Sequence, residues 1–253
     1  MQPLLKVQGL NKQIAQRSGF LQRKMVYLLK DISFCIGQGE TLAVIGETGA
    51  GKSTLAKVLA GADDASSGQI LLESELLKDG SKQLMDSRNI RLIFQDPTTS
   101  LNPALTIEEI LDDCLRFNTE LSAEERLEKI KQTLSKVGLL VEHRHYYPHM
   151  FSGGQLQRVA LARALILDPK VLVLDEALSS LDPSVRAQTV NLLLDLQRET
   201  GLSYVLITHH LSLVKHMSDQ VMVLDHGEIV EYGNTQEIFC NPKSKTCQRL
   251  LTC

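Results

Sequence analysis

One stretch of the chain combines glycines, a lysine and hydroxyl side chains at a spacing suited to binding phosphate. Residues 46–53 read Gly-Glu-Thr-Gly-Ala-Gly-Lys-Ser and match the pattern G-x-x-x-x-G-K-[ST]. They follow an apolar run, Thr41–Ile45, and precede a predicted helix over Thr54–Ala60. Glycines leave backbone N–H groups open to surround a phosphate, and a helix N-terminus favours its negative charge. A simple surface turn does not need the full pattern, so we predict a nucleotide phosphate site.

Each position of this loop is a candidate contact. Lys52 can reach the β- and γ-phosphates, Ser53 can ligate Mg²⁺, and Thr54 can contact the α-phosphate. The candidate nucleotide-binding residues are Gly46, Glu47, Thr48, Gly49, Ala50, Gly51, Lys52, Ser53 and Thr54.

Two carboxylates follow a second apolar run, Val171–Leu174. Burying Asp175 and Glu176 together is costly unless a cation meets them. We therefore interpret Asp175 as a Mg²⁺ ligand and Glu176 as the general base that activates a water. The alternative is a pair of acids that merely opens a helix.

Gln95 and His209 end two further apolar runs, Ile90–Phe94 and Tyr204–Thr208. A single histidine at a strand end is usually structural, but ligands of open α/β sheets bind at the carboxyl ends of the strands. Gln95 is thus a candidate for contacting both Mg²⁺ and the attacking water, and His209 for contacting the γ-phosphate.

A second anion site is suggested by Ser152-Gly153-Gly154-Gln155, which precedes a predicted helix over Leu156–Leu167. A hydroxyl and uncovered amides at a helix N-terminus attract anions. The simpler interpretation is an N-cap on a glycine turn. Asp182 precedes Pro183 at the start of another predicted helix, which ends at Gly201.

The elements that position these residues indicate an α/β fold. The four apolar runs are too short for helices and predict buried strands of a parallel sheet. Amphipathic runs near the N-terminus predict an antiparallel layer, and the region between Asp96 and Gln155 is helical in pattern. These remaining elements are strands over Val7–Leu10, Ile32–Ile36 and Gln69–Leu72, a helix from the Ser122/Glu125 capping box to Val137, a hairpin turn at Asp225–Gly227 and a helical tail after Gly233.

Composition sets the broad class. The chain has 253 residues, a net charge of −3 and 43% hydrophobic residues, so it carries no bulk charge for nucleic acid or anionic lipid. No apolar run reaches the roughly 18 residues that span a bilayer, and the N-terminus lacks a signal-peptide pattern. Five cysteines without a C-x-x-C pair indicate reduced thiols, and Cys240, Cys247 and Cys253 match no metal-ligand spacing.

Together these motifs resemble the ATP-binding subunits of ABC transporters over essentially the whole chain. The resemblance implies ATP and Mg²⁺ as ligands. It also implies a P-loop NTPase (RecA-like) core with an N-terminal antiparallel β layer and an inserted α-helical subdomain. The single domain 1–253 would then comprise a core of 1–95 and 156–253 and a helical, signature-bearing insertion of 96–155. The matching segments are Gly46–Ser53 (Walker A), Gln95 (Q-loop), Ser152–Gln155 (signature), Val171–Asp175 with Glu176 (Walker B), Ser179–Asp182 (D-loop) and His209 (switch histidine).

Finer features narrow the group. Phe94–Pro103 resembles the extended Q-loop of di- and oligopeptide transporter ATPases, and Tyr146–Met150 and Ala162–Leu167 resemble the second ATPase subunits of Sap peptide-transport systems. The sequence departs from the family pattern at three places. Ile14 stands where members have an aromatic residue that stacks on adenine, and Phe20 or Tyr27 could substitute for it. His210 stands where an aspartate is usual, and the tail after Asn241 differs from the usual one.

The resemblance implies a role in peptide import across a bacterial inner membrane, from its cytoplasmic face. Two ATPase domains meet head to tail in this family, so Ser152–Gln155 and Asp182 would serve a partner's ATP. The implied partners are a second, different ATPase, two permease subunits and, indirectly, a periplasmic substrate-binding protein, with no nucleic acid. A soluble ABC ATPase acting on ribosomes or DNA usually has two cassettes or a long coiled coil, and a small-molecule kinase would lack Ser152–Gln155.

Overall fold

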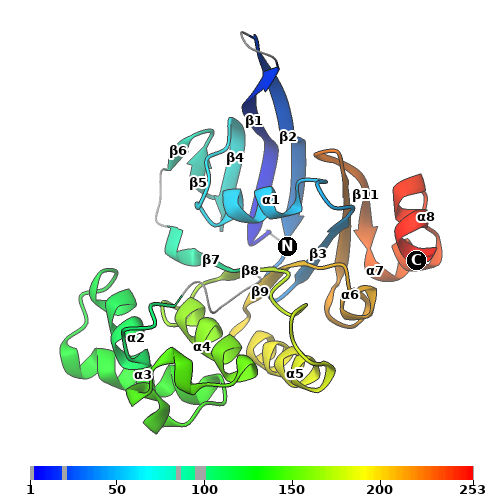
Figure 1. Ribbon diagram of the computed structural model, residues 1–253. Coiled ribbons are helices and arrows are strands. Elements are labelled where there is room, and N and C mark those ends of the chain that lie inside the picture. The colour runs from blue at the N-terminus through cyan, green and yellow to red at the C-terminus, as the bar shows by residue number, and fades with distance from the viewer. Residues whose placement is uncertain (1–2, 19–21, 84–86, 95–100, 253) are drawn as a thin grey trace.

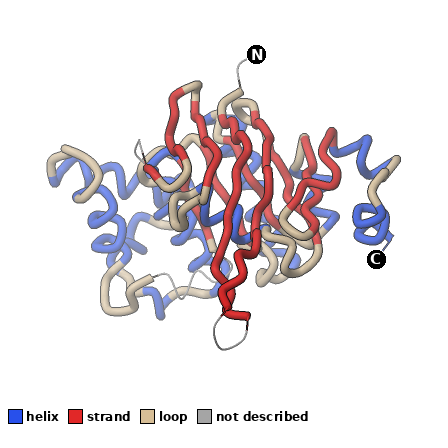
Figure 2. The backbone as a smooth tube through the Cα atoms, turned by 90° about the horizontal axis from the view of Figure 1, so that it is seen from above, coloured by secondary structure: helices blue, strands red, loops and turns tan. Residues whose placement is uncertain are grey.

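The computed structural model describes residues 3–18, 22–83, 87–94 and 101–252. Its strands form a mainly parallel sheet and an antiparallel sheet, and helices cover the faces of the parallel sheet (Figure 1). The strands lie at the centre, with helices on both sides and the C-terminal helix at one edge (Figure 2). This is the α/β architecture that the buried strand pattern predicts.

The parallel sheet carries the candidate site. Its strand order is β11-β10-β3-β9-β8-β7, with only β10 and β11 antiparallel. All four apolar runs of the sequence are strands of this sheet. The bounds are β3 (Thr41–Gly46), β7 (Ile90–Ile93), β8 (Val171–Asp175), β9 (Ser203–Ile207), β10 (Gln220–Asp225) and β11 (Glu228–Asn234).

Both faces of the central strands β3, β8, β9 and β10 are largely buried, which explains their unbroken apolar runs. Leu172 and Leu174 of β8 belong to one core cluster with the helical side of the molecule. Val171 and Val173 belong to a second cluster, shared with the antiparallel sheet and α1 (Lys52–Leu59). Since successive side chains of a strand point to opposite faces, each residue of β8 from Val171 to Leu174 meets a core.

The antiparallel sheet has the order β2-β1-β4-β5-β6 and extends further than predicted. The sequence indicated only Val7–Leu10 and Ile32–Ile36, but both strands continue into a long hairpin, in which the outer residues pair only with each other (Figure 1). Polar residues dominate this outer part, so it lacks a buried-strand pattern. The bounds are β1 (Leu5–Ser18), β2 (Gln22–Ile36), β4 (Ser67–Leu72), β5 (Glu75–Asp79) and β6 (Lys82–Gln83).

The helices largely begin and end at the predicted signals. The Ser122/Glu125 capping box opens α3, and Gly201 ends α5 with a left-handed φ of 70°. The helix after Ser152 starts at Gly153, earlier than predicted. The remaining bounds are α2 (Ile107–Arg116), α3 (Ala123–Lys136), α4 (Gly153–Leu165), α5 (Pro183–Thr200), α6 (Leu211–Met217), α7 (Thr235–Cys240) and α8 (Lys245–Thr252), with short 3-10 helices at Ser87–Asn89, Val141–His145 and Pro148–Met150.

The helices α2, α3 and α4 pack together on one side of the parallel sheet and share a core cluster with α5 (Figure 1). The predicted boundary between core and helical insertion, at 95/96, falls in 95–100, which lie outside the described residues. None of the helices in the described ranges is both long enough and apolar enough to cross a membrane.

Candidate functional site

The phosphate loop joins the carboxyl end of β3 to the N-terminus of α1. The first intrahelical bond of α1 runs from the Leu55 N–H to the Gly51 carbonyl, at 2.9 Å. The amides of Lys52, Ser53 and Thr54 therefore have no acceptor inside the helix. They lie at the positive end of the helix dipole, where an anion is favoured.

The glycines show that the loop is tightly packed at its ends and open in its middle. A Cβ on Gly46 would lie 2.2 Å from the Leu224 carbonyl oxygen, and one on Gly51 would lie 2.6 Å from the Leu28 carbonyl oxygen. A Cβ on Gly49 would meet no heavy atom within 4 Å. The loop is thus open at Gly49, where a phosphate group could approach its backbone.

Lys52 lies back across this loop. Its Nζ donates hydrogen bonds to the carbonyl oxygens of Gly46, at 2.7 Å, and Glu47, at 2.8 Å. An ammonium has three donors, so one remains for a phosphate oxygen. Partial burial lowers the pKa of Lys52, while the negative charges of Glu176 and Asp175 act in the opposite direction and favour the cation.

Ser53 and Asp175 are brought together from α1 and β8. The Ser53 hydroxyl donates to the Asp175 carboxylate at 3.1 Å. Partial burial raises the pKa of Asp175, and the bond from Ser53 opposes that rise. Mg²⁺ prefers oxygen ligands and commonly takes one or two protein groups, with phosphate oxygens and waters completing the shell. Within the described ranges no group of three or more His, Cys, Asp and Glu side chains forms a self-contained metal site. Ser53 and Asp175 therefore suit a Mg²⁺ ion whose other ligands come from a nucleotide and from water.

Glu176 and His209 meet at the ends of the neighbouring strands β8 and β9. The His209 Nδ1 lies 3.0 Å from the Glu176 carboxylate, which also accepts a hydrogen bond from the Ser179 hydroxyl. The Glu176 N–H donates to the Ile207 carbonyl at 3.0 Å, and its φ of 52° is left-handed. The His209 side chain is 64% exposed and that of Glu176 19%. This carboxylate is held in place beside the Asp175 site and still reaches solvent, as a general base must.

The Ser152 hydroxyl caps α4. It accepts the Gln155 N–H at 3.4 Å, while the Gln155 side-chain oxygen accepts the Ser152 N–H at 3.0 Å. The simpler interpretation of this motif, an N-cap, therefore describes the hydroxyl in this structure. A Cβ on Gly153 would meet nothing within 4 Å, so the start of the helix is open on that side.

Asp182 is the N-cap of α5, yet its side chain makes no capping hydrogen bond and it is exposed. Sequence reasoning missed Arg186, which lies one helical turn after Asp182. Its guanidinium donates to three carbonyl oxygens, those of Leu178 at 3.1 Å, Ser179 at 3.3 Å and Leu181 at 2.9 Å. Arg186 thus holds the segment between Glu176 and Asp182. An arginine just inside a helix gives no local signal for this role.

His210 occupies the position where an aspartate was expected. Its ring centroid lies 4.1 Å from that of His209, and its Nε2 is buried without a hydrogen-bond partner in the described part of the chain. Burial and the neighbouring His209 lower the pKa of His210. The acidic contact that an aspartate would make is replaced by a ring contact.

Two sequence predictions fall outside the described residues: Gln95 as a catalytic and metal-binding residue, and Phe20 as an adenine-stacking residue. Ile14 and Tyr27 lie in the described part of the β1–β2 hairpin. Ile14 is paired with Val26 and Gln13 with Tyr27, so Ile14 and Tyr27 lie on opposite faces. Only one of these two side chains can face a base bound on one side of the hairpin.

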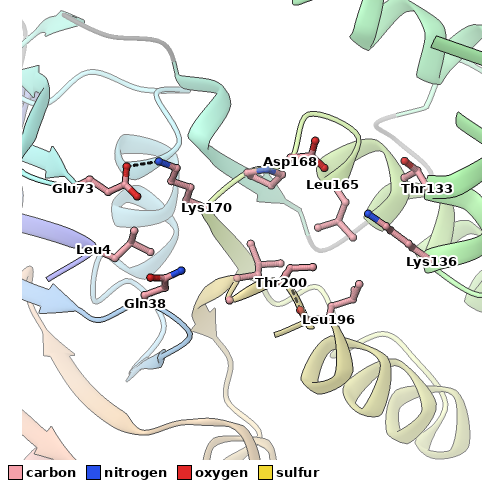
Figure 3. A pocket seen from close by; sticks show the side chains of 13 residues that line it. Leu4, Gln38, Glu73, Thr133, Lys136, Leu165, Asp168, Lys170, Leu196 and Thr200 are labelled. Carbon is pink, nitrogen blue, oxygen red and sulfur yellow. Dashed lines mark hydrogen bonds and ion pairs between the residues drawn. The ribbon is translucent and has the colours of Figure 1, made fainter. Parts of the chain in front are cut away.

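A cavity of about 250 Å³ lies elsewhere (Figure 3). Its lining includes Gln38, Lys170 and Gly201, which precede β3, β8 and β9. It is therefore at the amino ends of the strands, the opposite end from the phosphate loop. The cavity is not the nucleotide site.

Comparison with known proteins agrees with this geometry. A model of the family described as ABC transporter matches residues 29–179. The chain is 48% identical over 251 residues, covering 99% of it and 93% of the relative, to the putrescine export system ATP-binding protein SapF of Escherichia coli K12. It has the same identity and coverage to the peptide transport system ATP-binding protein SapF of Salmonella typhimurium. It is 46% identical to the dipeptide transport ATP-binding protein DppF of Haemophilus influenzae, over 99% of this chain and 77% of that protein.

Solved structures agree as well. The cbiO1 structure from Clostridium perfringens, part of the ABC transporter complex cbiONQ, superposes with a TM-score of 0.79 at 30% identity, covering 95% of this chain and 92% of that one. The ATP-binding cassette MJ0796, in a dimeric post-hydrolysis state bound to ADP and Pi, superposes with a TM-score of 0.75 at 26% identity, covering 91% and 98%. On these matches and on the phosphate loop, this chain belongs to the ABC transporter family, as an ATP-hydrolysing, ATP-binding subunit.

Proposed function

We propose that this chain hydrolyses ATP to power the transport of peptides across a bacterial inner membrane, at whose cytoplasmic face it binds two permease subunits. The observation that carries the proposal is the meeting of two pairs at one sheet edge: Ser53 with Asp175 at 3.1 Å, and Glu176 with His209 at 3.0 Å. An ATPase needs a phosphate-binding loop, a metal site beside it and a general base next to the metal site.

The geometry supports the following roles. The amides at the start of α1 and the remaining donor of Lys52 bind the β- and γ-phosphates. Ser53 and Asp175 hold Mg²⁺, which when bound neutralises charge on the phosphate oxygens. Glu176 accepts the proton of the attacking water, and His209 and Ser179 orient its carboxylate. Gln95 is proposed to contact both the metal and that water.

The open start of α4 supports a paired arrangement. Gly46–Thr54 supplies one chain's own phosphate site, whereas Ser152–Gln155 and Asp182 belong to other elements and are exposed or half-buried at their surface. We propose that they cover the ATP of a second, different ATPase, so that ATP closes a head-to-tail dimer and hydrolysis opens it. The helical segment 96–155 would carry this movement to the permeases, and a periplasmic substrate-binding protein would deliver the cargo.

Replacing Glu176 with Gln tests the catalytic assignment. The variant should bind ATP but hydrolyse it at least about 100-fold more slowly, because a positioned general base contributes roughly 10²–10⁴ to such a rate. Phosphate release by the chain purified together with its partner ATPase measures turnover, and size-exclusion chromatography of that pair with ATP should show a longer-lived dimer. Glu199→Gln on the exposed end of α5 is the matched control. Unchanged turnover of Glu176→Gln would remove Glu176 from this role.

The cargo has a second candidate, because one relative with 48% identity carries the name of a putrescine export system. Purification of the complex from detergent-solubilised membranes should recover two permeases and a second ATPase. Vesicles reconstituted with that complex should then show ATP-dependent movement of labelled peptide. Movement of putrescine alone would assign the chain to polyamine export instead.

A further inference from the structure

The C-terminal helix α8 is anchored against the strand that carries the phosphate loop. Cys247 is fully buried in a core cluster with Ile45 of β3 and Val223 of β10. The half-buried Glu231 carboxylate of β11 accepts the backbone N–H groups of Lys243 at 2.9 Å and Ser244 at 2.8 Å. The start of α8 is therefore fixed relative to the central sheet. Figure 1 shows α8 beyond β11, at the edge of the molecule.

Two contacts link this helix to the site. The Thr246 hydroxyl donates to the Asp225 carboxylate, at the end of β10, at 2.8 Å. One turn later, the Arg249 guanidinium pairs with the Glu47 carboxylate at 3.1 Å and lies 3.4 Å from the Thr246 hydroxyl. Glu47 is the second residue of the phosphate loop, and its carbonyl oxygen accepts a hydrogen bond from Lys52. An arginine from the last helix thus binds the loop that holds the nucleotide.

The charges give this contact a function. ATP brings several negative charges to a loop that already carries the Glu47 carboxylate, and like charges at short range oppose binding. Arg249 places a positive charge beside that carboxylate. Both side chains remain accessible, at 64% for Arg249 and 49% for Glu47, so the pair adds little to folding stability. The positive charge of Arg249 can still influence the affinity of an anionic ligand that binds next to the pair.

We propose that Arg249 is a positioning residue for nucleotide binding, which holds the Glu47 carboxylate at α8 and offsets its charge. The inference rests on the proposed function of the loop as the ATP site. It predicts an effect on ATP affinity and on KM, and none on kcat, because neither side chain contacts the catalytic base.

A double-mutant cycle on the full-length chain tests this. Arg249→Ala should raise the Kd for ATP about threefold in low salt, the size expected for one exposed charge pair. Glu47→Gln removes the carboxylate that Arg249 holds, so in a Glu47→Gln background Arg249→Ala should lose only the direct attraction of its own charge for ATP, and the increase in Kd should be smaller. The increase should also fall toward nothing at 1 M salt, where charges are screened within about 3 Å. Isothermal titration with ATP and Mg²⁺ gives the four Kd values.

The controls separate the possible failures. Arg198→Ala removes another exposed arginine, 75% exposed, from an ion pair with Asp195 on α5 and should leave the Kd unchanged. An unchanged Kd for Arg249→Ala, or an equal increase in both backgrounds, overturns the role of Arg249. If the unaltered chain binds ATP no better than Lys52→Ala does, the proposed ATP site itself fails.

Discussion

The glycines of the phosphate loop serve different purposes, which single substitutions can separate. Gly49 and Gly51 both have left-handed φ values, of 85° and 103°. Of these two, only Gly51 lies where a Cβ would collide with another backbone, the Leu28 carbonyl of β2. Gly49 thus provides conformational freedom alone, whereas Gly51 also allows the close approach of the antiparallel sheet.

We therefore expect Gly49→Ala to lower the free energy of unfolding by about 1–2 kcal/mol, the cost of a left-handed conformation for a residue with a Cβ. Gly51→Ala should cost about 1–3 kcal/mol more, because the backbone must also shift. Urea unfolding of the two variants measures the difference. Equal losses would show that the backbone at Leu28 can shift away from the added Cβ without lowering the free energy of unfolding.

At the scale of elements, α3 and α4 begin in the same way but have different surroundings. Ser122 and Ser152 each form a capping box with a residue three positions later. The proposed function gives only the start of α4 a ligand. The two caps therefore have the same structure, but only the cap at Ser152 is proposed to contact a nucleotide.

Replacing each serine with arginine uses this match. Both Ser122→Arg and Ser152→Arg should lose about 1 kcal/mol of unfolding free energy, since each removes an N-cap. Only Ser152→Arg should abolish ATP hydrolysis while ATP binding is retained, because the partner's nucleotide is blocked. Calorimetry, ATP titration and phosphate release report the three quantities. Loss of hydrolysis in Ser122→Arg as well would mean that folding, not the interface, is responsible.

The attachment of α8 depends on pH through Glu231. Partial burial acts to raise the pKa of Glu231, but the N–H groups of Lys243 and Ser244 outweigh it, and the pKa lies below the usual 4.5. A depressed pKa means that the carboxylate stabilises the folded state above about pH 4.5 and that this contribution is lost as the pH falls through the lowered value.

Glu231→Gln should accordingly lower the free energy of unfolding by about 1.5–3 kcal/mol at pH 7, the range for hydrogen bonds to a charged acceptor. The difference in unfolding free energy between the variant and the unaltered chain should shrink as the pH falls through the lowered pKa of Glu231, because the carboxylate of the unaltered chain then becomes neutral. Hydrogen exchange at residues 243–247 should show faster opening in the variant. Glu228→Gln on the same strand, which loses an exposed pair with Lys30, should have a much smaller effect.

At the scale of the whole molecule, the sequence predicts what depends on local pattern. The four buried strands, the capping box of α3 and the hairpin before β11 are confirmed because each has a signal within a few residues. The outer β1–β2 hairpin is missed because its pairing is exposed and leaves no apolar alternation. Arg249 is missed for another reason, because its partner Glu47 lies in a segment that only the tertiary fold brings near it. Arg186 is missed although its partners are close in sequence, because they are backbone carbonyl oxygens, which carry no residue-type signal.

The order of strands in the parallel sheet also dictates when the site can exist. β3, which ends in the phosphate loop, lies between β9 and β10, and both neighbours come from the last quarter of the chain. During synthesis the loop therefore leaves the ribosome long before the strands that hold it, and α8 follows later still. A growing chain carries the complete phosphate-binding sequence without a phosphate-binding site. ATP can therefore stabilise this protein only after β9 and β10 have been synthesised, so the nucleotide acts on the assembled sheet and does not guide the folding stages that precede it.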